Sequence, residues 1–96
     1  MLLNMLNPRQ IERLDALGSW VAASAIPRGR IVQPFLVYHA YELMKSGLSR
    51  DDIGQYFRSQ ERYQSDRPFM SLLWNVLEEG YEEFTTTTMY RDALKN

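Results

Sequence analysis

Helix-starting residues recur along this chain, and apolar side chains at helical spacing follow each of them. Pro8, Pro34 and Pro68 all stand where such spacing begins, and proline is favoured at the first position of a helix. Ser49 precedes a fourth such stretch and has Asp52 three residues later, which is close to a capping box. This pattern predicts a succession of separate helices.

The expected fold is all-α, a small bundle or irregular array of four main helices. Ile31 and Val32 are candidates for a short β-strand, but no second candidate strand lies nearby, so we expect no sheet. Four threonines after Phe84 favour a helix end, because β-branched side chains are restricted in a helix. We expect helices over residues 8–25, 34–46, 50–62 and 68–84, with a short fifth helix over 89–95 as an open alternative.

Three glycines indicate a close helix contact, a helix C-cap and a weak point in a helix. Gly18 lies among small residues of the first expected helix, so another backbone can approach there. Gly47 follows Lys45 and suits a left-handed C-cap. Gly80 is expected to weaken the last main helix or to end it early, because glycine is a poor helix former.

The size and composition of the chain restrict its chemistry. Ninety-six residues predict a single helical domain, 1–96, with one modest core. The absence of cysteine excludes disulfides, thiolate zinc sites and thiol catalysis. The start, MLLNMLN, lacks the basic segment of a signal peptide, and no apolar run is long enough to span a membrane, so we expect a soluble cytoplasmic protein.

The single histidine, His39, lies in the stretch FLVYHAYELM. On a helical wheel it falls at the border of the apolar face, three residues before Glu42. We interpret it as a partly exposed polar residue. The alternative is a catalytic role as a general base, so a small enzyme using His39 is the third-ranked function. Because no nucleophile turn and no phosphate-binding glycine motif is present, we expect a non-enzymatic protein without a cofactor.

A group of glutamates on the last main helix offers the one conceivable metal site. Glu78 and Glu82 are four residues apart, as are Glu79 and Glu83, but no Glu-x-x-His accompanies them. We expect no metal and a solvated acidic flank. The alternative is a contact for a basic partner, because like charges at this spacing destabilise an isolated helix.

Residues 48–68 suggest a degenerate helix-turn-helix. Leu48, Ile53 and Gly54 match the opening of its first helix, but Arg58 stands at the turn position and Pro68 soon stops the second helix. The net charge of −1 also argues weakly against a dedicated nucleic-acid binder. A DNA-binding transcriptional regulator is therefore the second-ranked function, and its candidate anion or DNA contacts are Arg28, Arg30, Arg50, Arg58 and Arg62.

Aromatic side chains are more numerous than one small core requires. On the last main helix, Met70, Trp74 and Tyr81 widen the apolar arc to roughly 200° at 100° per residue. Such a helix is either central in the bundle or covered on a second side by a partner. The side chains that lie off the expected core faces, and that we predict to bind a partner protein, are Trp20, Tyr38, Tyr41, Met70, Trp74 and Tyr81.

The first-ranked prediction is therefore a small interaction protein that acts as a regulator, an adaptor or an inhibitor. Its aromatic helix faces would dock into an apolar groove of a partner protein. A homodimer is expected, because small helical proteins often bury spare apolar surface in a twofold interface.

Overall fold

The computed structural model of the protein describes residues 6–25 and 32–95. Within these ranges the backbone forms five helices and no strand, so the predicted all-α class is confirmed. The helices are α2 (Pro8–Ala25), α3 (Pro34–Lys45), α4 (Arg50–Arg58), α5 (Glu61–Gln64) and α6 (Arg67–Lys95). None of these helices combines the length and the apolar character that crossing a membrane requires.

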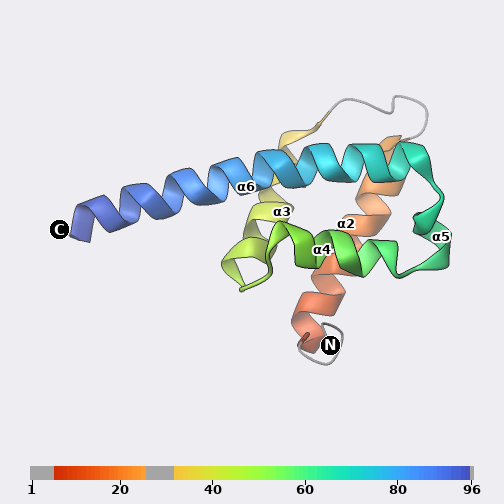
Figure 1. Ribbon diagram of the computed structural model, residues 1–96, viewed down its shortest axis with the longest axis horizontal. Coiled ribbons are helices and arrows are strands. Elements are labelled where there is room, and N and C mark those ends of the chain that lie inside the picture. The colour runs from red at the N-terminus through yellow and green to blue at the C-terminus, as the bar shows by residue number, and fades with distance from the viewer. Residues whose placement is uncertain (1–5, 26–31, 96) are drawn as a thin grey trace.

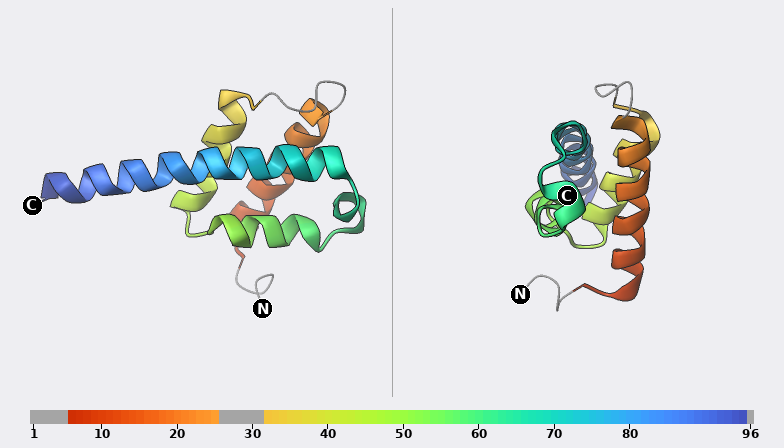
Figure 2. Two further views of the ribbon diagram at one scale, coloured as in Figure 1. Left: turned by 45° about the horizontal axis from the view of Figure 1, so that its top comes forward. Right: turned by 90° about the vertical axis from the view of Figure 1, so that its right-hand side faces the viewer.

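The helices form two layers that cross each other. Helices α2 and α3 make one layer, and α4 and α6 lie alongside each other in the second (Figures 1 and 2). Helix α6 packs against all four other helices. The wide apolar arc of this helix therefore has an explanation within the chain, since α6 is the central element of the array.

One hydrophobic core lies between the two layers. Its fully buried side chains repeat at helical spacing on α2, α3, α4 and α6, as the apolar stripes predict. The largest of them are Phe57, Phe69, Leu14, Leu17, Leu36, Leu43, Ile53, Leu72, Leu73, Leu77, Val21 and Val76.

The predicted helix starts have direct hydrogen-bond support. At α4, the Ser49 hydroxyl accepts a bond from the Asp52 backbone N–H, and the Asp52 carboxylate accepts one from the Ser49 N–H, both at 3.0 Å. At α2, the Asn7 side chain accepts from the Gln10 N–H at 2.8 Å, and the Gln10 side chain accepts in return at 3.1 Å. These bonds satisfy N–H groups that have no partner in the first helical turn. Gly47 has a φ of +111° just after α3, as expected for a glycine C-cap.

Gly18 and Gly80 lie at close helix contacts. A Cβ atom at Gly80 would lie 2.9 Å from the Cβ of Ala40, so α3 and α6 approach closely at this point. A Cβ atom at Gly18 would lie 2.7 Å from the Phe57 ring. The expectation that Gly80 ends the last main helix early is wrong, because α6 continues through it to Lys95. The close contact with Ala40 offsets the poor helix propensity of glycine.

The helix expected over residues 50–62 is divided in two. Helix α4 ends at Arg58, Gln60 is extended, and a separate four-residue α5 follows. The turn brings Tyr63 back onto the core, where its ring stacks on Phe69 at a centroid distance of 4.1 Å. Burial of this ring is the tertiary contact that favours the break over a continuous helix.

The expected helix end near Phe84 is also wrong. Helix α6 continues through the four threonines to Lys95, and its last turns project beyond the other helices (Figure 1), so residues 89–95 form no separate fifth helix. The Thr85 hydroxyl donates to the backbone carbonyl of Tyr81, one turn earlier. The Thr85 hydroxyl therefore has a hydrogen-bond partner within the helix, although a bond of this kind does not itself stabilise the helix.

Candidate interaction surface

Four ring side chains from α2 and α3 form a cluster that we call the aromatic patch: Trp20, Phe35, Tyr38 and His39. The Trp20 indole lies against the His39 imidazole at a centroid distance of 4.4 Å and against Phe35 at 6.0 Å. His39 also contacts Phe35 at 6.5 Å and Tyr38 at 5.4 Å, both edge to face. The four rings therefore form one continuous surface and are not scattered separately over the fold.

The aromatic patch is largely open to solvent. Trp20 is 38 % exposed, Phe35 41 % and Tyr38 56 %, and His39 between them is partly buried. Single exposed apolar residues are common on proteins, but contiguous exposed apolar surface marks sites of interaction. Because the rings hold one another in place, a partner would immobilise few additional side-chain torsions on binding.

The surroundings of His39 favour an uncharged imidazole. Burial lowers the pKa of His39, the nearby Arg13 guanidinium lowers it further, and the Glu42 carboxylate acts in the opposite direction. A shallow hollow beside the ring is lined by Arg9, Glu12, Arg13, Ala16, Trp20 and His39. In the part of the chain that the structure describes, His39 makes no hydrogen bond to a nucleophile or a carboxylate, so its principal contacts are aromatic.

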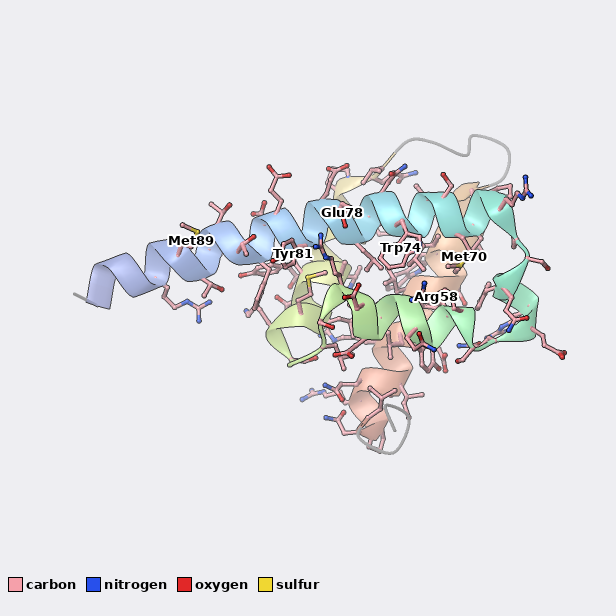
Figure 3. The ribbon with its side chains drawn as sticks, in the orientation of Figure 1. Arg58, Met70, Trp74, Glu78, Tyr81 and Met89 are labelled. Carbon is pink, nitrogen blue, oxygen red and sulfur yellow. The ribbon has the colours of Figure 1, made fainter. Side chains whose placement is uncertain are left out.

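The second tryptophan, Trp74, is placed differently. It is partly buried against the core, and a Cβ atom at Gly54 would lie only 2.7 Å from its ring. The Arg58 guanidinium lies over the Trp74 ring, 5.5 Å from the ring centroid (Figure 3). Met70 is likewise packed against the core. Both predicted partner-binding residues are therefore engaged within the chain.

Tyr81, on the same helix, keeps 39 % of its surface exposed but lies under an arginine. The Arg50 guanidinium is 4.1 Å from the centroid of the Tyr81 ring and donates a hydrogen bond of 2.8 Å to Glu78. Figure 3 labels Glu78 and Tyr81 on α6. Tyr41 is partly buried, with Phe84 at 6.4 Å and the Lys45 ammonium at 5.4 Å from its ring centroid. Of the six residues that the sequence singled out, the structure brings only Trp20 and Tyr38 together in the aromatic patch.

The candidate DNA-contacting arginines also have partners in the fold. Arg50, Arg58 and Arg62 each lie over an aromatic ring, those of Tyr81, Trp74 and Tyr63 respectively. Arg28 and Arg30 lie outside the described residues. The four-residue α5 that follows α4 is too short to act as the recognition helix of a helix-turn-helix, which lies along the major groove. This geometry lends the DNA-binding hypothesis no support.

Two members of the aromatic patch, Phe35 and His39, were not predicted to bind a partner. They are four residues apart and therefore share one face of α3, which is a signal that the sequence contains. What the sequence does not contain is the position of Trp20, which the packing of α2 on α3 brings onto the same face.

Comparison of the chain with models of protein families, with curated proteins and with solved structures finds no match.

Proposed function

We propose that this protein is a small non-enzymatic interaction protein, a regulator, adaptor or inhibitor, that binds a partner protein through the aromatic patch. The observation that carries the proposal is the mutual contact of Trp20, Phe35 and Tyr38 with His39 while the first three remain 38 to 56 % exposed. A set of rings fixed in place yet open to solvent is the kind of surface that dominates binding energy in interfaces.

The composition of the patch suits a protein partner. Trp20 and Phe35 supply apolar area, and the Tyr38 hydroxyl and the His39 ring supply polar groups that can pair at the edge of an interface. Charged side chains flank the rings, with Arg9, Glu12 and Arg13 on α2. An apolar centre with a charged rim is the usual arrangement of a specific interface, in which the rim contributes to orientation.

A second copy of this chain is one possible partner, and a homodimer is part of the proposal. A twofold axis through the aromatic patch would place the same rings of two subunits against each other. Sedimentation measurements over a range of protein concentrations test this version. A dimer that is lost in the Phe35→Ala variant would support the homodimer. If the unsubstituted protein is a monomer at every concentration, the homodimer is wrong and the partner is a different protein.

The direct test compares two matched substitutions. Phe35→Ala removes a ring that is 41 % exposed in the aromatic patch, and Tyr81→Ala removes one that is 39 % exposed on α6. Affinity capture from the native cell, read by mass spectrometry, identifies the partner, and calorimetry measures its affinity for each variant. We expect Phe35→Ala to weaken binding by about 2 kcal/mol, the range of an interface hot spot, and Tyr81→Ala to have little effect.

Circular dichroism of both variants provides the folding control. If Tyr81→Ala weakens the complex and Phe35→Ala does not, the docking face lies on α4 and α6 and the proposal is wrong. Equal affinity of both variants for the partner would also contradict it.

A further inference from the structure

An open groove whose lining is largely apolar runs between α3 and α6. It has a volume of about 410 Å³ and is lined by Val32, Pro34, Val37, Tyr38, Tyr41, Glu79 and Glu83. A smaller hollow of about 280 Å³ adjoins it, shares Val37, Glu79 and Glu83, and adds Glu82 and Thr86. We call the two together the α3–α6 groove.

The sequence builds this groove through helical spacing and one close contact. Positions 79, 82, 83 and 86 share one face of α6, and positions 37, 38 and 41 share one face of α3. Gly80 lies buried between them, with Ala40 across the contact. Because neither residue has a large side chain, the helix backbones approach closely, and the longer side chains on either side form the walls.

The walls of the groove have a one-sided charge. Three carboxylates, those of Glu79, Glu82 and Glu83, line it. Among the residues that the structure describes, the ion pairs are Lys45 with Glu42 and Arg50 with Glu78, so none of the three groove carboxylates is paired. Carboxylates held beside apolar surface attract cations and repel phosphates, which favours a basic protein segment over nucleic acid or an anionic membrane.

The tyrosines of the groove suit the same kind of ligand. The Lys45 ammonium already lies 5.4 Å from the centroid of the Tyr41 ring, which shows that this ring is placed to accept a cation on one face. Tyr38 belongs both to the α3–α6 groove and to the aromatic patch, so the two surfaces are continuous. One partner could therefore contact both.

We infer that the α3–α6 groove binds a basic segment of a partner protein, an inference that rests on the proposed function. An apolar side chain of the segment would lie over Val32 and Val37, and its lysine or arginine side chains would pair with Glu79 and Glu83. The aromatic patch supplies binding energy in this arrangement, and the groove determines which chemical class of partner is accepted.

The test uses two soluble peptides as probes, one of alternating lysine and leucine and one with glutamate in place of lysine. Calorimetry measures the affinity of each peptide at low and at physiological salt. We expect the lysine peptide to bind with an affinity that falls as salt is added, and the glutamate peptide not to bind. Backbone amide shifts in NMR spectra should change along the faces of α3 and α6 that line the groove.

Variants with equal charge changes separate the groove from the net charge of the molecule. Glu79→Gln with Glu83→Gln should weaken binding of the lysine peptide about tenfold, equivalent to about 1.4 kcal/mol. The matched control, Asp51→Asn with Glu61→Gln, removes the same charge from exposed positions on α4 and α5 and should change the affinity by less than about twofold. Equal weakening in both pairs, or binding of the glutamate peptide, would overturn the inference.

The same variants distinguish this inference from the proposed function. If the cellular partner loses affinity for Phe35→Ala but binds the Glu79→Gln, Glu83→Gln variant normally, the aromatic patch is the interface and the groove assignment is wrong. If the glutamine pair instead changes only the dimerisation of the protein, the groove holds a second copy, which also overturns the inference. Loss of partner affinity in both variants supports the two surfaces as parts of one interface.

Discussion

The two tryptophans of this protein begin from similar positions in the sequence and reach different environments. Both lie away from the main apolar stripe of their helices. Trp74 on α6 packs over Gly54 of α4 and next to Arg58, and is partly buried against the core. Trp20 on α2 meets only His39 and Phe35 of α3 among the described rings and stays 38 % exposed.

The comparison shows that a position off the core stripe does not by itself identify a binding surface. What decides exposure is whether a neighbouring helix has a gap that fits the ring. Gly54 provides such a gap on α4, because it has no side chain at the point where the Trp74 indole lies. On α3, the residue opposite Trp20 is the partly exposed ring of His39, which the indole covers without becoming enclosed.

The largest expected effect comes from filling the gap under Trp74. Gly54→Val places methyl groups where a Cβ atom alone would lie 2.7 Å from the indole, so the indole or α4 must shift. We expect a loss of about 3 kcal/mol in the free energy of unfolding, measured by urea denaturation, as for an overpacked core position. Gln55→Ala, at the exposed neighbouring position, should change stability by less than about 0.5 kcal/mol. Unchanged stability of Gly54→Val would mean that Trp74 is not seated on Gly54.

The next largest effect concerns the two indoles themselves. Trp74→Ala opens a cavity between α4 and α6 and should reduce the free energy of unfolding by about 2 kcal/mol. Trp20→Ala removes a side chain that is already partly open to solvent, so it should reduce the free energy of unfolding by about 1 kcal/mol or less. Urea denaturation of both variants in the same buffer gives the difference directly.

Fluorescence of single-tryptophan variants measures the solvent exposure of each indole separately. Trp20→Phe leaves Trp74 as the reporter, and Trp74→Phe leaves Trp20. We expect acrylamide to quench Trp20 more strongly than Trp74, because Trp20 is the more exposed indole. The reverse order of quenching, or an equal stability loss in the two alanine variants, would contradict the contrast drawn between the two regions.

The smallest expected effect is the pH dependence of the patch. The pKa of His39 is lowered in the folded protein, mainly by burial and then by Arg13, whereas an unfolded chain has a histidine pKa of about 6.5. The unfolded state therefore takes up a proton first as the pH falls. Stability should decrease as the pH drops below about 6.5, until the folded histidine is also protonated.

A variant isolates this contribution from that of the carboxyl groups. His39→Gln should remove the part of the pH dependence that begins near pH 6.5, and the difference between the two stability profiles gives the contribution of His39. If the two proteins show the same dependence of stability on pH between about pH 7.5 and pH 5, folding does not lower the pKa of His39.

Local features of the fold were predictable from the sequence because their causes are local. The bounds of α2, the start of α3 at Pro34 and the capping box at Ser49 follow from residues within one helical turn of each site. The errors occur where a tertiary contact outweighed a local preference. Burial of Tyr63 against Phe69 accompanies the break after Arg58, and the contact of Gly80 with Ala40 lies inside a helix that glycine was expected to weaken.

The candidate surface was only half predictable for the same reason. Trp20 and Tyr38 were identified by their positions on helical wheels, and their partner-binding role stays a prediction. Phe35 and His39 join them because α2 packs on α3. Trp74 and Met70 are instead partly buried against the core.

The sequence alone determined that this chain forms helices, where most of them begin and which side chains are apolar, because helix starts and helical spacing are properties of neighbouring residues. The tertiary structure decided which rings are covered and which remain open. That choice depends on contacts between residues far apart in the chain, such as Trp74 with Gly54 and Trp20 with His39, whose geometry no single helix contains.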